Sequence, residues 1–547
     1  MPMSLCPVSS SIPACNKSVP AAPRSNGARI LEPPAERVCQ LLADNRGIID
    51  RADYDVQGIR LADLAVQARR QLVAAALAYT RQYRDVPGPV AEPTGILLAG
   101  HQPEIFHPGV WLKNFVLHQL ARQHDAVAIN LVIDSDTIKT SSLRIPGGTV
   151  AKPRAAAVLF DSPSAEIPFQ ARAIQDPELF ASFGRRAAER LSPLVADPLV
   201  REFWPLAIEC ARRTKNLGQS LSQARHQWEG GWGLTTLEIP QSVVCCLPAF
   251  HRLTAHLMAH LPRLWEVYNS AIAEYRRRHH VRSHSHPAPE LAAEGAWLEA
   301  PFWIWTAENP RRRRVFVQPR GDDMVVSDLQ GLEIALRLSP ESESDTAVTQ
   351  LAALAGRGIH LRSRALLTTL AARVLLGDLF IHGIGGAKYD RLTDAMIQRF
   401  FCLEPPTFLI VSGTLHLPIV HESATIDDLR AVRNRLRELE FHPEAFLDPQ
   451  SQTAQQNGST AAHWVNEKRQ WIGTKVSHQD ARRRCHAIRE ANRQLQPYVA
   501  DRRAELAARG ELLSAQLRAE AVLSSREYGF CLYPEQTLRD FLLDFPA

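Results

Sequence analysis

Two stretches of this chain share one layout: a short apolar segment, a polar turn that contains glycine, and the start of a helix. The first covers residues 95–109 and reads Gly-Ile-Leu-Leu-Ala-Gly-His-Gln-Pro-Glu-Ile-Phe-His-Pro-Gly. The second covers residues 378–390 and reads Asp-Leu-Phe-Ile-His-Gly-Ile-Gly-Gly-Ala-Lys-Tyr-Asp. In α/β proteins, strand ends deliver side chains to ligands and helix N-termini offer free N–H groups. The two stretches therefore predict an α/β fold with one composite active site.

The residues around the first stretch predict a parallel crossover. The wholly apolar run at residues 96–99 is typical of a strand covered on both faces, and Pro108 suits the first position of a helix that ends near His124. A second buried strand is predicted at residues 126–133. A strand–helix–strand unit of fewer than about forty residues has the size of a parallel βαβ unit. Residues 361–414 repeat this α/β pattern.

The remaining segments differ in composition and periodicity. Ser, Pro and Ala dominate the first residues, which is typical of a disordered tail. Near the C-terminus, apolar residues recur every three or four positions, as in a helix, and Pro497 interrupts the pattern. This predicts an antiparallel helical arm. We expect a disordered tail at residues 1–25, a helical segment at 26–90, an α/β core at 91–440 with a helix-rich insertion at about 165–300, a helical arm at 455–525 and a terminal segment at 526–547.

Composition excludes several classes of protein. The 63 basic residues are interspersed with 58 acidic ones, so the net charge of +5 does not indicate a nucleic-acid-binding protein. The sequence contains no run of about eighteen apolar residues, so no membrane span is predicted. The nine cysteines form no CxxC pair, which favours reduced thiols and a cytoplasmic protein. Cys245 and Cys246 follow two valines and are predicted to lie in a buried strand.

Three polar residues follow the first predicted strand. His101 and Gln102 come directly after it, and His107 precedes the helix, so these side chains could bind a phosphate, carboxylate or hydroxyl. In the alternative, they satisfy backbone groups of the loop and His107 caps the helix. The spacing of His101 and His107 matches no common pattern of metal ligands, and no metal site is predicted.

Two carboxylates follow the second predicted strand. Asp134 and Asp136 should lie at the same sheet edge as the first turn, because both strands are expected to be parallel. They could hold a substrate amine, orient a ribose or act as a base. The alternative is a polar loop in which an Asp caps a helix.

The second glycine turn offers both backbone and side-chain groups. Gly385 and Gly386 permit close backbone approach or positive φ, and Lys388 and Tyr389 could face the same cleft. The glycine spacing falls short of the dinucleotide fingerprint. A purely structural turn is the alternative.

Two clusters of basic residues are interpreted as solvated surface. Residues 276–286 are rich in Arg and His and predict a polar helix end and loop, with anion binding as the alternative. Residues 311–314 are four consecutive arginines between two strand-like stretches and predict a solvated hairpin loop.

Taken in order, these motifs resemble the BshC family of cysteine ligases of bacillithiol synthesis, which join cysteine to a glucosaminyl-malate. The residues concerned are the turn at 100–102, the following Pro-Gly, Lys113, the acid-rich turn at 134–136 and the glycine turn at 383–389. The resemblance implies a Rossmann-like parallel-sheet core with a helical insertion, and a homodimer formed through a coiled-coil-like C-terminal arm.

The sequence departs from the family pattern at three places. The family usually has Gln where His101 stands, a His in the acid-rich turn, and Glu where Lys388 stands. A second resemblance, to the WbqC-like family, rests on the start at His101-Gln102-Pro103 and does not account for the later glycine turn.

The resemblance implies a ligase that forms a carbon–nitrogen bond between an amino acid and a small sugar-acid-like acceptor. Each candidate residue then has a role. His101 and Gln102 would bind acceptor oxygens, Asp134 and Asp136 would hold or deprotonate the amine, and the remaining substrate-binding residues would be His107, Lys113, Gly385, Gly386, Lys388 and Tyr389. Two alternatives stay open: a catalytically silent scaffold, and a nucleotidyl- or sugar-transferring enzyme. The sequence leaves open whether a nucleotide is the cofactor.

Overall fold

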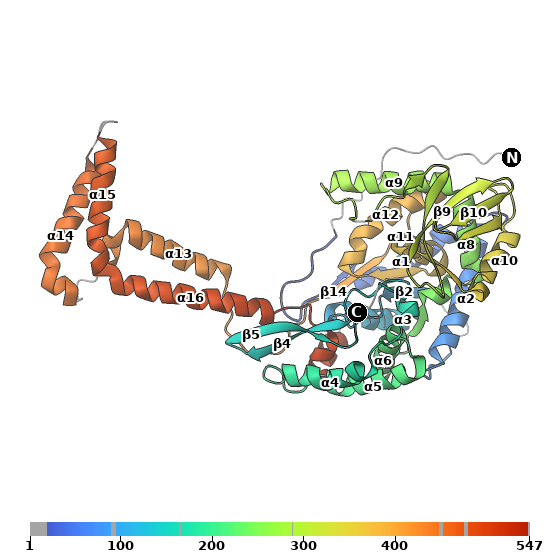
Figure 1. Ribbon diagram of the computed structural model, residues 1–547, viewed down its shortest axis with the longest axis horizontal. Helices are drawn as coiled ribbons and strands as arrows, with labels where there is room; N and C mark the ends of the chain where they lie inside the picture. The colour runs from blue at the N-terminus through green and yellow to red at the C-terminus, as the bar shows by residue number, and fades with distance from the viewer. Residues whose placement is uncertain are drawn as a thin grey trace. The chain divides into compact units, whose positions relative to one another are not determined.

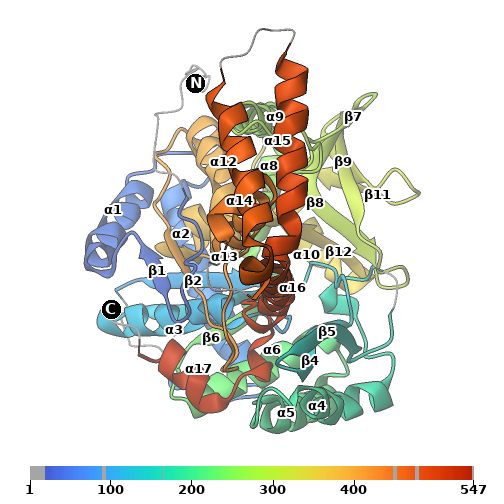
Figure 2. The same ribbon diagram turned by 90° about the vertical axis from the view of Figure 1, so that its left-hand side faces the viewer.

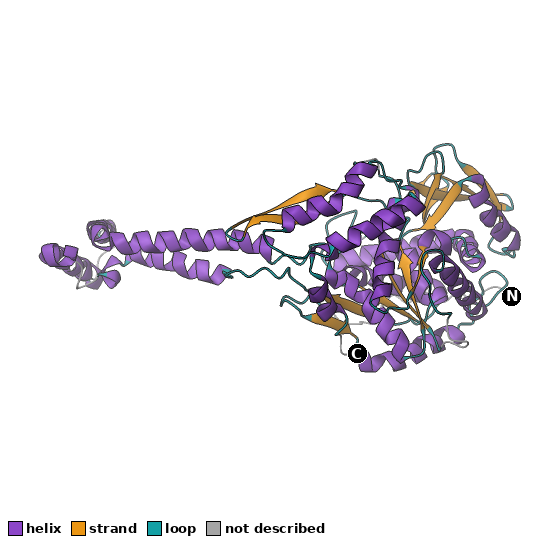
Figure 3. Cartoon of the chain, turned by 90° about the horizontal axis from the view of Figure 1, so that it is seen from below, coloured by secondary structure: helices purple, strands orange, loops and turns teal. Residues whose placement is uncertain are grey.

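The computed structural model describes residues 19–88, 94–163, 166–286, 288–447, 452–474 and 480–544. Two compact units are present. Unit 1 contains residues 1–145, 156–418 and 526–547, and unit 2 contains residues 146–155 and 419–525. Helices make up much of both units (Figure 3). Most of the predicted N-terminal tail lies outside the described residues.

A six-stranded sheet lies at the centre of unit 1, with the strand order β1-β14-β13-β2-β3-β6 (Figure 1). Its strands are β1 (Arg29–Glu32), β2 (Ile96–His101), β3 (Val127–Val132), β6 (Leu237–Pro240), β13 (Leu379–His382) and β14 (Leu409–Gly413). All neighbours are parallel except the edge strand β1, which is antiparallel to β14. The predicted α/β class is confirmed.

After the edge strand β1, the chain builds the parallel part of this sheet outward from β2. β3 and β6 are added on one side of β2, and the chain then crosses to the other side to form β13 and β14. The direction of the connections therefore reverses between β2 and β13, a point at which open parallel sheets commonly bind ligands.

Helices cover both faces of the sheet, which explains the uninterrupted apolar runs of the strands. All six residues of β3 and the first four of β2 are buried. The helices of the first part of unit 1 are α1 (Val38–Asp50), α2 (Leu61–Thr80) and α3 (Pro108–Gln123), and those of the last part are α12 (Ile384–Phe401) and α17 (Glu535–Leu542). The predicted helix that begins at Pro108 is confirmed as α3.

The segment at about 165–300 is helix-rich, as predicted, but it is more than an insertion. Its helices are α4 (Pro177–Leu191), α5 (Val200–Thr214), α6 (Leu217–Gly231), α7 (Gln241–Val244), α8 (Pro248–Ala259) and α9 (Leu261–Arg278). β6 lies between α6 and α7 and completes the parallel sheet. The predicted strand at Cys245 and Cys246 is wrong, because both follow the short helix α7, and only Cys245 is buried.

A second, antiparallel sheet of unit 1 has the strand order β11-β10-β9-β8-β12. Its strands are β8 (Trp297–Thr306), β9 (Arg313–Arg320), β10 (Asp323–Ser327), β11 (Glu333–Arg337) and β12 (Ile359–Ser363), and the short strand β7 (Ala293–Glu294) pairs with β8. The predicted loop at residues 311–314 is shorter than expected, since Arg313 and Arg314 belong to β9.

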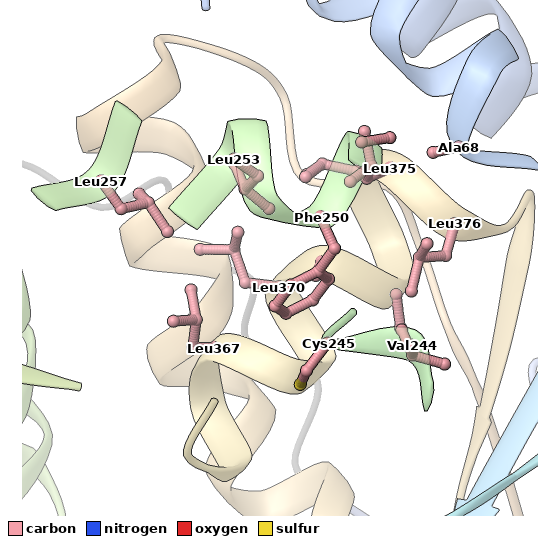
Figure 4. Close-up of a cluster of buried hydrophobic side chains, with 14 of the residues drawn as sticks. Ala68, Val244, Cys245, Phe250, Leu253, Leu257, Leu367, Leu370, Leu375 and Leu376 are labelled. Atoms are coloured by element: carbon pink, nitrogen blue, oxygen red, sulfur yellow. The ribbon is translucent and has the colours of Figure 1, made fainter. Parts of the chain in front are cut away.

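The main hydrophobic core of unit 1 includes residues from α8 and from the helical segment that follows β12. That segment consists of α11 (Ala365–Ala371) and a π-helical turn, η4 (Ala372–Leu376). Phe250 and Leu253 of α8 belong to the same buried cluster as Leu370 and Leu375 (Figure 4). The helix α10 (Asp345–Ala353) contacts α8. A hairpin of β4 (Ser142–Thr149) and β5 (Lys152–Leu159) was not predicted.

Unit 2 is mainly helical and confirms the helices expected near the C-terminus. It contains α13 (Ile426–Phe441), α14 (Gln452–Gly473), α15 (Ala481–Leu495) and α16 (Ala500–Leu523). α13 contacts α16, and α14 lies beside α15 (Figure 2). Pro497 lies in a 3-10 turn at Gln496–Val499, which separates α15 from α16 as predicted. The coiled-coil character of this unit and its role in a dimer remain predictions.

Candidate active site at the carboxyl edge of the sheet

The carboxyl ends of five parallel strands meet at one edge of the central sheet. Ala99 of β2 pairs with Ile381 of β13, and His101 pairs with Val132 of β3. The turns after β2, β3 and β13 therefore lie at the same edge. The structure thus brings the turns of His101, Asp134 and Gly385 together, as the sequence pattern predicts.

His101 is partly buried at the end of β2. Its Nδ1 lies 3.2 Å from the backbone oxygen of Gln102, and its ring packs edge-to-face on Phe106 with 4.9 Å between centroids. Burial and the nearby Lys113 lower the pKa of His101 to about 3. The imidazole is therefore neutral near pH 7 and can act as a hydrogen-bonding group rather than as a cation.

Lys113 supports the same turn from α3. Its Nζ donates to the backbone oxygen of Gly100 at 2.8 Å, and the side chain is buried. Burial and Arg225 lower the pKa of Lys113 to about 8. This lysine holds the end of β2 and adds positive charge behind it.

His107 is the N-cap residue of α3, but its side chain does not cap the helix. Its Nε2 lies 3.9 Å from a carboxylate oxygen of Glu527. Burial, Arg526 and Lys113 lower the pKa of His107 to about 4. His107 thus occupies the cap position that the alternative expects, but its side chain makes no capping hydrogen bond.

Asp134 is buried and points to the start of α7. Its Oδ1 accepts a hydrogen bond from the backbone N–H of Ser242 at 2.9 Å, and its Oδ2 accepts one from the Ser242 hydroxyl. Burial raises the pKa of Asp134. Because both oxygens are already bonded within the protein, this geometry supports the alternative in which an Asp of this turn holds a helix start.

Asp136 lies in the same turn but is more accessible. Its Oδ2 accepts from the Gln102 amide at 3.0 Å, and its Oδ1 accepts from Arg312 at 3.0 Å and from the backbone N–H of Thr137 at 2.9 Å. The side chain is 35% exposed, so this Gln102–Asp136–Arg312 group is a polar surface that a ligand can reach.

Arg312 is a residue of this site that sequence reasoning missed. It comes from the connection between β8 and β9, its side chain is only 20% exposed, and its guanidinium lies 4.8 Å from the Trp303 ring centroid. The prediction of a solvated loop is therefore wrong for Arg312. The adjacent tryptophans and arginines on β8 and β9 were the available signal, since arginine commonly stacks on aromatic rings.

The glycine turn after β13 is the first turn of a helix. α12 begins at Ile384, directly after the N-cap residue Gly383. Neither Gly385 nor Gly386 has positive φ. A Cβ on Gly385 would meet no atom within 4 Å, whereas one on Gly386 would lie 2.7 Å from Nδ1 of His382. Close approach to His382, and not backbone strain, is thus the constraint on Gly386.

Lys388 and Tyr389 differ in their surroundings. Lys388 is exposed near the start of α12. The Tyr389 hydroxyl lies 3.2 Å from Nε2 of His286, and their rings meet edge-to-face. Tyr389 is therefore tied to the histidine-rich loop after α9. Arg276 holds that loop by donating to the backbone oxygens of His284, His286 and Ala288.

His382 and Asp390 form a buried pair that sequence reasoning did not assign to the site. Nε2 of His382, at the end of β13, lies 3.0 Å from Oδ2 of Asp390 on α12, and the same oxygen accepts from Arg373 at 2.7 Å. Burial alone would raise the pKa of Asp390, but Arg373 and His382 hold it well below its usual range. Asp390 is therefore ionised beside the imidazole. The rings of Phe380 and Phe408 flank His382.

A second buried polar group lies between β6 and α6. His226, Glu229 and Glu238 have the geometry of metal ligands. Arg225 donates to a carboxylate oxygen of both glutamates, and the nitrogens of His226 lie within hydrogen-bond distance of the Tyr83 hydroxyl and the Thr236 backbone oxygen. The arginine thus takes the place that a cation would occupy, and the group is a structural ion network.

One hollow over the described residues is lined by none of these side chains. It has a volume of about 500 Å³ and is lined by the C-terminal half of α3, the turn after α6 and the end of α17. None of the predicted site residues lines it.

Comparison with known proteins adds no family. No protein-family model matches this chain, and no curated protein sequence matches it. Among the residues that the structure describes, no helix is long and apolar enough to cross a membrane.

Proposed function

We propose that this chain is an enzyme with a Rossmann-like core that forms a carbon–nitrogen bond between an amino acid, such as cysteine, and a small sugar-acid-like acceptor. One observation carries the proposal: the sheet reverses its connections between β2 and β13, and the His101 turn and the Gly383 turn both lie at that point. Two polar turns beside a helix start at such a position suit a small polar substrate.

The side chains at this edge divide into two groups. Gln102, Asp136 and Arg312 offer an amide, a carboxylate and a guanidinium that are partly exposed and already aligned by mutual hydrogen bonds. Such groups suit hydroxyl and amine groups of an acceptor. The N–H groups at the start of α12, together with Lys388, suit a carboxylate or phosphate.

A nucleotidyl- or sugar-transferring enzyme is the second candidate. No side chain caps the N-terminus of α12, and an added Cβ at Gly383 or Gly385 would meet no atom within 4 Å. An open helix N-terminus of this kind favours phosphate groups. If the reaction consumes a nucleotide, its phosphates would lie here.

The proposal includes the compartment. The described cysteines are all free thiols, and three of them are buried. Free thiols are typical of proteins from reducing compartments, so we propose that the enzyme acts in the cytoplasm.

A condensation assay tests the proposal. The full chain is incubated with cysteine and an amino-sugar malate conjugate, with and without magnesium ATP, and the product is sought by mass spectrometry as the sum of the two substrates less one water. In parallel, amino acids, hydroxy acids, sugar conjugates and nucleotides are screened for thermal stabilisation. Binding of nucleotides alone would favour the transferase, and stabilisation by no compound would favour a catalytically silent scaffold.

Two variants test the residues. A charge-assisted hydrogen bond contributes about 1.5–3 kcal/mol, so Lys388→Ala should weaken binding of an anionic ligand roughly ten- to a hundredfold. His101→Ala should also weaken binding. Calorimetry measures affinity and circular dichroism checks folding. If both variants fold and bind as tightly as the wild type, the assignment of these residues to the site is wrong.

A further inference from the structure

A reaction that joins an amine to an acyl carbon needs a group that accepts the amine proton. The two carboxylates expected to do this are engaged elsewhere. Both oxygens of Asp134 bind Ser242, and the oxygens of Asp136 bind Gln102, Arg312 and the backbone of Thr137. The edge must therefore supply another base if the proposed function is right.

His382 has the geometry of such a base. It ends β13, next to the point where the sheet reverses its connections, and it is 95% buried. Nε2 lies 3.0 Å from ionised Asp390, so this nitrogen carries the proton that donates to the carboxylate. Nδ1 then keeps its lone pair. The described residues provide no hydrogen-bond partner for Nδ1.

Nδ1 faces the open side of Gly386. The nearest atom to a Cβ built on this glycine is Nδ1, at 2.7 Å, and Gly386 is exposed to solvent. The absence of a side chain at Gly386 therefore leaves a path from solvent to the lone pair. The path lies at the first turn of α12, where the backbone N–H groups favour an anionic substrate group.

We propose that His382 is the proton acceptor of this site, that Asp390 is the residue that positions it, and that Gly386 keeps Nδ1 accessible. This inference rests on the proposed function, because it names the base of that reaction. Arg373 contributes by pairing with Asp390 at 2.7 Å, which keeps the carboxylate ionised.

The proton and electron balance is as follows. The acyl donor is a carboxylate activated as an acyl phosphate or acyl adenylate, which is the co-reactant that the step requires. The amine nitrogen forms a bond to the acyl carbon, and the bond from that carbon to the phosphate oxygen breaks, with the electron pair leaving on the phosphate. The amine proton passes to Nδ1, and the resulting imidazolium is stabilised by Asp390. Solvent then removes the proton.

Two adjacent glycines supply a matched pair of variants. Gly386→Ala places a methyl group against Nδ1, whereas Gly385→Ala adds the same methyl group one residue earlier, in open space. Both lie in the first turn of α12, and both changes favour the helix. A difference between them therefore reports on Nδ1 and not on helix stability.

The first test needs no substrate. Diethyl pyrocarbonate reacts with an unprotonated, accessible imidazole nitrogen, and peptide mapping by mass spectrometry locates the modified histidine in the full chain. We expect His382 to react in the wild type and in Gly385→Ala, and to react at least about tenfold more slowly in Gly386→Ala. An unreactive wild-type His382, or equal rates in the two variants, would overturn the proposal.

The second test reads the role of Asp390. Nitrogen-15 NMR of histidine-labelled protein, with the His382 signal assigned by its loss in His382→Gln, should show the tautomer with the proton on Nε2. Asp390→Asn should shift His382 toward the other tautomer, because the amide can donate to Nε2. A wild-type His382 with its proton on Nδ1 contradicts the proposed base.

Activity separates this inference from the proposed function. If a condensation product is found, Gly386→Ala should lower kcat at least about a hundredfold. An unchanged kcat in Gly386→Ala refutes His382 as the base and leaves the ligase intact. If no amine yields a product, the ligase fails, while the reactivity and tautomer of His382 still decide whether Nδ1 is a free proton acceptor.

Discussion

Replacing Arg373 with Met should strongly destabilise unit 1. The guanidinium is buried and bonds three groups: Asp390 at 2.7 Å, Asp394 at 2.6 Å and the backbone oxygen of Pro406. Methionine has a similar apolar stem and provides none of these donors. Asp390, which is 1% exposed, would keep its hydrogen bond with His382 but would lose its arginine partner.

The expected magnitude follows from that burial. Removing one partner of a buried ion pair costs about 3–5 kcal/mol, because the other charge stays buried and uncompensated. The exposed pair Arg185–Glu189 on α4 provides the control, since its side chains are 69% and 61% exposed. An exposed pair at this spacing contributes about 0.3–0.5 kcal/mol, so Arg185→Met should change the free energy of unfolding by less than about 1 kcal/mol.

The loss in the free energy of unfolding caused by Arg373→Met should also depend on pH, and the ionisation of Asp390 decides the direction of that dependence. The pKa of Asp390 in the folded protein lies well below that of an unfolded Asp, so its pair with Arg373 stabilises the fold fully above about pH 5. This stabilisation is lost as the pH falls from about 5 toward the folded pKa. The difference between the wild type and Arg373→Met should therefore be largest at pH 7 and should narrow in acid.

Urea denaturation followed by tryptophan fluorescence measures this difference. Only Trp464 and Trp471 of the ten tryptophans lie in unit 2, so the signal reports mainly on unit 1. A loss below about 1 kcal/mol at pH 7, equal to that of Arg185→Met, would refute the view that Arg373 compensates a buried charge. A penalty that grows in acid would refute the assignment of an ionised Asp390.

Three further predictions concern the edge of the sheet and unit 2. Arg312→Ala should lower the free energy of unfolding by less than about 1 kcal/mol, because the pair with Asp136 is partly exposed. Calorimetry should nevertheless show that the variant binds any ligand found by the thermal screen more weakly. Unchanged affinity would show that Arg312 does not belong to the site. The pKa of Lys113 is about 8 in the folded protein and about 10.4 in the unfolded chain. Between these two pH values the unfolded chain binds more protons than the folded protein, so the free energy of unfolding of the wild type should rise with pH. Denaturation curves of Lys113→Met should lack that rise. Light scattering should show a dimer that is lost on deletion of residues 461–523, and a full-length monomer would contradict the role of the arm.

The strands and helices that the sequence predicts well are those with long, regular patterns. The apolar runs of β2 and β3 and the three/four spacing of α2 each have one satisfactory reading, because both strands are covered on both faces and α2 buries one continuous stripe. β6 was missed because its pattern is short and includes a charged residue. It has four residues, and one of them is Glu238, whose burial depends on Arg225 from α6.

The site was predicted in part, because strand order decides which turns meet and strand order is not a local property. The turns at His101 and Asp134 could be placed together from one βαβ unit. The partners of individual side chains could not. Asp134 and Asp136 are two residues apart in one polar turn. Asp134 is buried and bonded to Ser242, whereas Asp136 is partly exposed beside Arg312, which comes from the connection between β8 and β9.

Gly385 and Gly386 show most clearly why a motif and its chemistry can separate. In the sequence they are equivalent neighbours whose spacing falls short of a dinucleotide fingerprint, and that shortfall counts against a nucleotide claim drawn from glycines alone. In the structure only Gly386 is constrained, and the constraint is the side chain of His382. In our proposal, the glycine at position 386 keeps Nδ1 of His382 accessible, and the approach of a phosphate is not needed to explain it. The missing fingerprint therefore does not argue against an enzyme whose key group at this turn is a histidine.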